Sequence, residues 1–303
     1  MLVQMLKTAL PVFAALFIGV LCRKKEILTR EGVDSVKKVA VNITLPAVLF
    51  PAFATADYAA RNLLIPVSVF CACLLALFLG KIGAKLTRMR GSLAPFLMTG
   101  FEAGMLGYGL FGFLYPEELL PRFALIDLGQ CMFVFSVYKI LLNGRGGAKN
   151  AVRDALNSPV MWSMVLGVIF GATGLWNALI PSGAADIVLN TADFLSAPTS
   201  CLILIAVGYD LSLREIRFGR VLGYVGMRLI VMAVIFAALT LLDRYAFGGI
   251  IHTGGLVLML ILPAPFVLPI FANAGDERGD VASALSLMTL LTLAIFTAMA
   301  AFV

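Results

Sequence analysis

The sequence has few charged residues, and this shortage decides its structural class. Only 13% of the 303 residues are charged and 61% are hydrophobic. Water-soluble domains have about 25% charged and about 45–50% apolar residues, so a water-soluble fold is excluded. Little chain remains between the apolar segments, which leaves no room for a soluble catalytic domain. The net charge of +6 is interpreted as a signal of membrane orientation and not of nucleic-acid binding.

Residues and motifs typical of catalysis are scarce as well. His252 is the only histidine, and none of the five cysteines forms a C-x-x-C pair. The phosphate-binding pattern G-x-x-x-x-G-K-[ST] is absent, which argues against an ATP-driven pump. An intramembrane enzyme would need a paired acid and base, or a metal set, at one depth. The sequence has only scattered single acids, so we expect no enzyme, no catalytic residues, no metal site and no cofactor.

What the sequence does contain is long apolar segments. A helix needs about 20 mostly apolar residues to cross a bilayer. Ten segments qualify, at about 2–22, 36–54, 62–82, 93–114, 120–142, 158–177, 187–209, 219–242, 249–273 and 281–302. They are continuously apolar and do not alternate, which favours helices over a transmembrane barrel. The predicted fold is an all-α polytopic membrane protein with ten transmembrane helices.

The chain divides into two similar halves. Residues 143–157 are Gly-rich, basic and polar, and they separate a first unit, 1–142, from a second unit, 158–303. In each half the second segment carries a proline and the fourth is interrupted by glycine or proline. Because each half has five spans, the second half is predicted to be inverted relative to the first. Inverted five-helix repeats with broken helices are typical of secondary transporters, whose site lies near the bilayer midplane.

The distribution of Lys and Arg predicts the orientation. These residues concentrate in the loops that follow the first, third, fifth and seventh segments. Basic loops face the cytoplasm, so both termini are expected outside and the 143–157 linker inside. The loop before the tenth segment differs, because Asp276, Glu277 and Asp280 outnumber Arg278 there. Acidic residues contribute little to this rule, and we predict a multi-pass protein of the cell (inner) membrane.

Helix-breaking residues in the second, fourth and ninth segments mark candidate interruptions. Pro46 lies inside the second segment and frees a backbone carbonyl, for which Asn42 is a nearby side-chain partner. This proline either marks a ligand site or is a packing kink. The fourth segment holds five glycines, at 100, 104, 107, 109 and 112, and the ninth holds prolines at 263, 265 and 269. Close helix packing is one explanation for the glycines.

The other explanation for these breaks is a binding site. Two interrupted helices that face each other place the N-termini of half-helices at the midplane, where they suit an anion. The predicted substrate-binding residues are Asn42, Pro46, Glu102, Gly104, Gly107, Gly109, Pro263, Pro265 and Val267.

Three ionisable residues lie deep in the apolar segments. Glu102 is roughly 12 Å into the fourth span, Asp127 is roughly 10 Å from the outer face and Arg228 is roughly 13 Å from the inner face. Glu102 has three possible roles: it carries a coupling proton, it coordinates a cation, or it forms a structural ion pair with Arg228. Asp127 is the second candidate for coupling, and its alternative is a hydrogen bond to a neighbouring helix. Arg228 alone would extend toward the inner interface.

Four stretches give the chain a resemblance to a known family. They are LPVFAALFIGVLCRKKEILTREGVDSVKKVAVNITLPAVLF, NSPVMWSMVLGVIFG, SAPTSCLILIAVGYDLS and GDVASALSLMTLLTL. In this order and spacing they resemble the first two, the sixth, the seventh and the tenth spans of the auxin efflux carrier family. That family includes bacterial organic-acid permeases and the plant PIN-formed auxin exporters, and the resemblance covers essentially the whole chain.

The resemblance implies a fold shared with bile-acid symporters and sodium/proton antiporters. Helices 1, 2, 6 and 7 would form a scaffold that dimerises, and helices 3–5 and 8–10 would form a transport domain. The fourth and ninth helices would cross at the site, and the motion would be elevator-like. The substrates implied are organic anions such as malate, malonate or indole-acetate.

The sequence departs from the family pattern at the site itself. Family members often show Asn-x-Gly-x-x-Gly-x-Pro in the fourth span, where this chain has Glu102 in place of the Asn and Gly109 in place of the Pro. In the ninth span, Val267 stands where the family often has a polar Asn. A carboxylate beside an anion site repels the substrate unless it is protonated or paired. Proton coupling, or a less anionic substrate, therefore becomes more plausible.

The sequence as a whole predicts a dimeric secondary carrier for a small mono- or dicarboxylate. The coupling ion would be a proton or sodium. The partners expected are this small molecule, the lipid bilayer and a second copy of the chain, with no nucleic acid. The alternatives are a channel, a transceptor that binds its ligand without moving it, or a carrier of a less anionic amphipathic metabolite.

Overall fold

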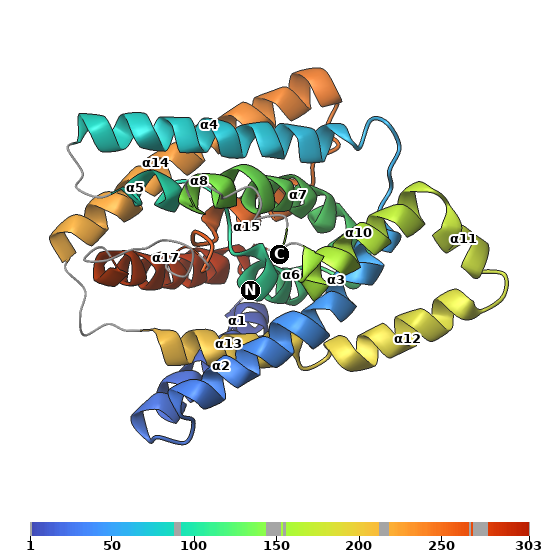
Figure 1. The fold of residues 1–303 in the computed structure, drawn as a ribbon, viewed down its shortest axis with the longest axis horizontal. Coiled ribbons are helices and arrows are strands. Elements are labelled where there is room, and N and C mark those ends of the chain that lie inside the picture. The colour runs from blue at the N-terminus through green and yellow to red at the C-terminus, as the bar shows by residue number, and fades with distance from the viewer. Residues whose placement is uncertain are drawn as a thin grey trace.

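The computed structural model describes residues 2–87, 92–143, 153, 156–211, 218–266, 268 and 278–302. Every regular element in these ranges is helical (Figure 1). The α-helices are α1 (Leu2–Lys24), α2 (Arg30–Val39), α3 (Leu45–Ala54), α4 (Leu64–Leu86), α5 (Ala94–Leu97), α6 (Tyr108–Leu114), α7 (Leu120–Phe133), α8 (Lys139–Asn143), α10 (Pro159–Ala172), α11 (Leu175–Leu179), α12 (Ala184–Ser196), α13 (Thr199–Asp210), α14 (Phe218–Leu242), α15 (Thr253–Ile261) and α17 (Arg278–Met299). The short elements η1 (Ala40–Thr44), η2 (Ala103–Gly107), η4 (Val134–Tyr138) and η5 (Asp243–Phe247) are π-helical, and η3 (Glu117–Leu119) is a 3-10 helix.

The length and composition of the helices identify a polytopic membrane protein. Within the described residues, six helical stretches are long and apolar enough to cross a bilayer: Arg30–Ala54, Leu64–Leu86, Glu117–Leu142, Ala184–Asp210, Gly219–Phe247 and Gly279–Met299. Two shorter apolar helices, Ala103–Leu114 and Pro159–Ala172, lie among them. The all-helical, multi-pass class expected from the sequence is therefore confirmed.

The helices pack in two groups. In the first, α1 packs on α13 and α10 packs on α3. In the same group, α12 contacts α3 and α2 contacts α13. In the second, α4 packs on α7 and α14, and α14 packs on α17. Figure 1 shows α4 on one side of the molecule and α2 with α13 on the other, with α7, α17 and α6 between them. Contacts of α3 with α7, of α13 with η2 and α6, and of α1 with α17 and α6 join the two groups.

Glycines allow the closest helix contacts. A Cβ atom at Gly19 on α1 would lie 2.1 Å from the carbonyl oxygen of Ile205 on α13. A Cβ atom at Gly208 on α13 would lie 2.1 Å from the carbonyl oxygen of Leu16. Both distances are far below any permitted contact, so only glycine lets these two backbones approach so closely. Such close approach is the usual basis of helix packing in membranes, where burial of apolar surface gives no driving force.

Pro46 does not break its segment but changes its winding. The second apolar segment runs from α2 through the π-helical η1 into α3, and Pro46 is in the first turn of α3. The wider π-helical turn accommodates a proline that has no N–H to donate. The backbone remains helical here, whereas the fourth and ninth segments are interrupted.

Candidate functional site

The fourth and ninth apolar segments each contain a break in the helix. The fourth consists of α5, which ends at Leu97, and of η2 with α6, which begin at Ala103. In the ninth, α15 ends at Ile261 and the chain from Leu262 to Phe266 is not helical. Each break therefore exposes backbone groups that have no partner within a helix.

The two breaks contact each other. Gly100 has φ of +70°, a conformation that side-chain-bearing residues rarely adopt. A Cβ atom there would lie 2.9 Å from Cγ of Pro265, and one at Gly107 would lie 2.8 Å from Cδ1 of Leu262. The backbone N–H of Glu102 donates to the carbonyl of Pro263 at 3.0 Å. The structure thus brings together the glycines and prolines of the two segments.

Glu102 binds backbone amides from both breaks. The residue is 8% exposed, and its Oε1 accepts a hydrogen bond from the N–H of Met105 at 3.2 Å. Its Oε2 accepts from the N–H of Phe266 at 2.5 Å. The first bond caps the start of the helix that leads into α6, where the helix dipole favours a negative charge. The second bond ties this cap to the chain that follows α15.

Arg228 binds backbone carbonyls from the same two breaks. It lies on α14 and is 4% exposed. Its Nη1 donates to the carbonyl of Leu97 at 2.7 Å, and its Nη2 donates to those of Gly100 at 2.9 Å and Leu262 at 2.8 Å. These carbonyls include the ends of α5 and α15, where the helix dipole favours a positive charge. The guanidinium also lies 5.4 Å from the ring centre of Phe101.

Glu102 and Arg228 therefore have different partners. Within the part of the chain that the structure describes, no ion pair joins them, and the contacts give no support to the predicted pairing. Arg228 also does not extend toward an interface, because its head group is held by three buried carbonyls. The physical reason is local: a helix break leaves N–H groups on one side and C=O groups on the other, and each charge binds the groups of opposite polarity.

Asp127 belongs to a neighbouring network of side chains. It is 1% exposed and accepts hydrogen bonds from Oη of Tyr108 at 3.0 Å, Nε2 of Gln130 at 2.9 Å and Sγ of Cys131 at 3.4 Å. Oε1 of Gln130 accepts in turn from the N–H of Phe101 at 3.3 Å. The network thus reaches the residue before Glu102. Sequence reasoning missed Gln130 and Tyr108, although a glutamine one turn after a buried acid is a usable signal.

The remaining predicted residues lie at different distances from this crossing. Asn42 is exposed, and its side-chain amide donates to the carbonyl of Lys38 on its own helix at 2.8 Å. Pro46 is half-buried, and its neighbour Leu45 would be 3.2 Å from a Cβ atom at Gly104. A Cβ atom at Gly109 would lie 3.1 Å from Oγ of Ser200 on α13. Val267 and Pro269 lie outside the described residues.

One feature next to the site was not anticipated from the sequence, and the sole histidine lies at the start of the ninth segment. Oγ1 of Thr199, at the start of α13, is buried and has no hydrogen-bond partner within the described ranges. This helix packs against η2, so a polar group without a partner lies on an element next to the crossing. His252 caps α15, because its Nδ1 accepts from the N–H of Gly255 at 2.9 Å, and its ring packs 4.9 Å from that of Tyr115. The histidine thus has a structural role.

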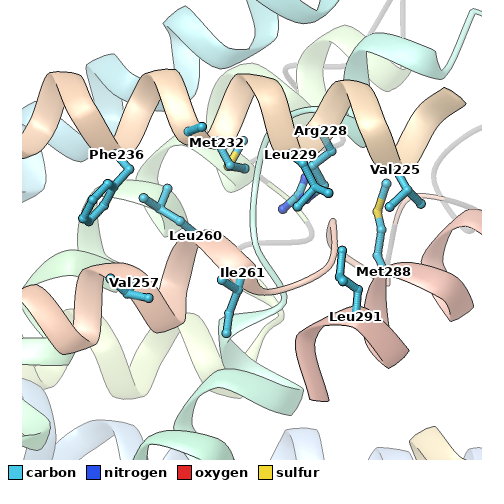
Figure 2. A pocket seen from close by; sticks show the side chains of 11 residues that line it. Val225, Arg228, Leu229, Met232, Phe236, Val257, Leu260, Ile261, Met288 and Leu291 are labelled. Atoms are coloured by element: carbon cyan, nitrogen blue, oxygen red, sulfur yellow. The ribbon is translucent and has the colours of Figure 1, made fainter. Parts of the chain in front are cut away.

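A cavity of about 240 Å³ lies beside Arg228 between α14, α15 and α17. Figure 2 shows its walls, which are apolar except for Arg228 and include Met232 and Phe236 on α14, Leu260 and Ile261 on α15, and Met288 on α17. Among the residues that the structure describes, no group of three His, Cys, Asp or Glu side chains could hold a metal ion.

Known proteins give a broad functional indication. No family model matches the sequence. An uncharacterized transporter of Methanothermobacter thermautotrophicus is 25% identical over 300 residues, which cover 95% of this chain and 94% of that protein. A second uncharacterized transporter, from Methanocaldococcus jannaschii, is 27% identical over 218 residues, 69% of each chain. Together with the apolar helices, these similarities support a multi-pass membrane transporter.

Proposed function

We propose that this protein is a secondary active transporter of a small organic anion, with its site where the fourth and ninth segments cross. One observation carries the proposal: two broken helices meet at a point where a buried carboxylate binds backbone amides and a buried guanidinium binds backbone carbonyls. Broken helices that meet within the membrane are the usual binding element of secondary transporters. The sequence resemblance to the auxin efflux carrier family supports the same substrate class.

The helix contacts support two inverted repeats of five spans, 1–142 and 158–303. If the sixth segment corresponds to the first and the seventh to the second, the contact of α1 with α13 corresponds to that of α10 with α3. Both contacts are extensive. In the same way the contact of α4 with α7 corresponds to that of α14 with α17. This pairwise agreement is what a pseudo-two-fold relation between the halves requires.

The two groups of helices support an elevator-type motion. The first group contains the elements of segments 1, 2, 6 and 7, which would form the scaffold and the dimer interface. The second contains segments 3–5 and 8–10, which would carry the crossing. Both chain termini would lie on the outer side of the cell membrane. Where α6 meets α13, the contact between the groups includes the small residues Gly109 and Ser200, which suits sliding at that place.

The coupling ion in this proposal is a proton, and Glu102 is its first candidate carrier. Glu102 is buried at the crossing itself, and ionised carboxylates are costly in such surroundings. Asp127 is the second candidate, because Gln130 and Phe101 connect it to the break. A less anionic amphipathic substrate is an alternative, favoured by the fact that Glu102 already places an acid at the anion-binding amides.

Transport in liposomes tests the proposal. The purified protein is reconstituted, and charge movement and uptake are measured for malate, malonate and indole-acetate, with and without a pH gradient. We expect saturable uptake of at least one acid that the gradient accelerates and that shows counterflow. A rate far above carrier turnover without counterflow would indicate a channel. Binding without uptake would indicate a transceptor, and folded protein without binding or uptake would contradict the proposal.

A further inference from the structure

We infer that Glu102 and the substrate carboxylate compete for the same two backbone amides, those of Met105 and Phe266. When Glu102 is ionised it occupies these amides itself, and it must release them before an organic anion binds. The inference rests on the proposed function and specifies how substrate and proton are coupled at that site.

The donors themselves carry the first step of the argument. A carboxylate here receives one N–H from the start of the helix that leads into α6 and one from the chain after α15. These amides come from two different segments and converge on the two oxygens of one carboxylate. Such a pair of donors binds any carboxylate whose two oxygens can reach the two amides, whether it belongs to a side chain or to a free acid. Glu102 shows that the place accepts a carboxylate.

The surrounding charges carry the second step. The titratable groups near Glu102 are Asp127 and Cys131 on α7, Tyr108 on α6, Tyr138 on η4, and Arg228 on α14. Arg228 is the single cation in this set, and its three described bonds go to carbonyls. A substrate anion added to an ionised Glu102 would therefore place like charges together in a poorly hydrated site. Uptake of one proton by Glu102 removes this repulsion.

The charge balance follows directly. Glu102 takes one proton from solution and becomes a neutral carboxylic acid, and the substrate carboxylate accepts the two amide hydrogen bonds. The two amide hydrogen bonds pass from Glu102 to the substrate carboxylate, and the only covalent bond formed is the O–H bond of the Glu102 carboxyl group. For a monoanion the site therefore gains one proton and one negative charge. A monoanion then moves with one proton and without net charge. A dianion carries one negative charge, so malonate or malate gives a current that indole-acetate does not.

Thr199 provides an independent indication of a ligand. Its buried hydroxyl has no partner within the described residues, and it lies on the helix that packs against η2. Buried polar groups normally have a hydrogen-bond partner, and in the proposal that role belongs to the bound acid. Thr199→Val then weakens acid binding at every pH without changing the pH dependence. Equal binding by Thr199→Val and wild type would remove this indication.

The first test measures acid binding against pH. Dissociation constants are measured for malonate and, separately, for indole-acetate between about pH 6.5 and 8.5. The carboxyl groups of both acids are ionised in this range. Wild type is expected to lose up to about tenfold in affinity per pH unit, because one proton is bound with each anion. Glu102→Gln is expected to bind with a nearly flat profile. A steep profile that survives in Glu102→Gln would overturn the inference.

A matched control is available at Asp243. Its Oδ1 also accepts two backbone N–H bonds, from Ile250 at 2.9 Å and from Ile251 at 3.1 Å. Asp243 itself is half-buried and lies where η5 begins. Asp243→Asn therefore removes a carboxylate that also binds two backbone amides, at a place that is not the crossing. Its pH profile is expected to match that of wild type. A profile flattened equally by both variants would mean that loss of any amide-bound acid is sufficient, which contradicts competition at Glu102.

The second test does not depend on transport. Glu102→Ala vacates the amides, so acetate is expected to raise the melting temperature of this variant by several degrees more than it raises that of wild type. Sodium chloride at equal ionic strength is the salt control. If Glu102→Ala does not fold, Glu102→Gly is used in the same way. Equal effects of acetate on the variant and on wild type would overturn the inference, whereas a panel of acids that wild type does not transport would overturn only the proposed function.

Discussion

The two helix breaks at the crossing are built by opposite means. The first, between α5 and η2, depends on glycine: Gly100 takes a left-handed conformation, and Gly107 leaves room for Leu262. The second, after α15, depends on Pro263 and Pro265, which have no N–H to continue a helix. One break is flexible by composition and the other is stiff. Gly100 has no side chain and so leaves room for the Pro265 ring, whose Cγ would lie 2.9 Å from a Cβ atom at position 100.

The charges are divided in the same unequal way. The glycine break contributes Glu102, which binds an amide of its own segment and one of the proline break. The described residues of the proline break contribute no charge. Its carbonyl at Leu262 accepts from Arg228 of α14 and that at Pro263 from the N–H of Glu102, while the preceding carbonyl of Ile261 accepts from Thr292 of α17 at 2.5 Å. The comparison teaches that each charge is placed according to the polarity of the helix ends and not according to the other charge.

Exchanging the two charges is the strongest way to break this comparison. Glu102→Arg and Arg228→Glu each place a charge against backbone groups of the same polarity, at a cost of about 3–5 kcal/mol of folding free energy. Because the two side chains bind different backbone groups, we expect the double exchange to be at least as unstable as either single variant. Thermal unfolding in detergent measures this. A double variant with wild-type stability would restore the ion-pair hypothesis.

A milder change at the same place is Arg228→Lys. An ammonium group keeps the charge but cannot reproduce the planar fork that reaches Leu97, Gly100 and Leu262 together. We expect a loss of about 2–3 kcal/mol, equivalent to one or two charged hydrogen bonds. Unfolding midpoints compared with those of Arg220→Lys, an exposed arginine on the same helix, check this. Equal midpoints for the two variants would mean that charge alone matters at position 228.

The glycine side of the comparison is tested by Gly100→Ala. The new Cβ must adopt a positive φ and would meet Pro265, so we expect a loss of about 1–3 kcal/mol. Gly112→Ala is the matched control, because a Cβ there meets nothing within 4 Å. The control is expected to be as stable as wild type or slightly more stable, since alanine favours helix. Similar stabilities for both variants would show that Gly100 is not required for the crossing.

The sequence predicted the fold class and the two interrupted segments because both follow from local composition. Apolar length predicted membrane-crossing helices, six of which are long and apolar enough within the described residues. The glycines around Gly104 and the prolines at 263 and 265 marked the interruptions. The partners of the buried charges were not predictable, because they depend on which helix end folds against which side chain. Arg228 lies more than a hundred positions from Gly100, and no local pattern connects them. The partner of Asn42 is local instead, because its side chain donates to the carbonyl of Lys38 on its own helix.

Asp127 sharpens the comparison between an acid held by backbone and one held by side chains. Asp127→Asn keeps the shape but turns one acceptor oxygen into a donor, which conflicts with Tyr108 or Gln130. We expect a loss of about 1–2 kcal/mol and slower transport. The slope of transport against pH is expected to persist, because Glu102 carries the proton in the proposed mechanism. A slope lost in Asp127→Asn and retained in Glu102→Gln would assign coupling to Asp127.

The smallest expected effect on stability is that of Gly109→Ala. This glycine lies on α6 where the crossing meets α13, and a Cβ atom there would be 3.1 Å from the Ser200 hydroxyl and 3.4 Å from its Cβ. The hydroxyl can rotate away, and alanine favours helix, so the folding free energy should change by less than about 1 kcal/mol. An elevator-type motion, however, requires this surface to slide. We therefore expect several-fold slower transport with unchanged acid binding in Gly109→Ala, measured against Gly112→Ala on the exposed side of the same helix. Equal rates for the two variants would mean that α6 and α13 do not move past each other, and the site would then open by a local change at the breaks themselves.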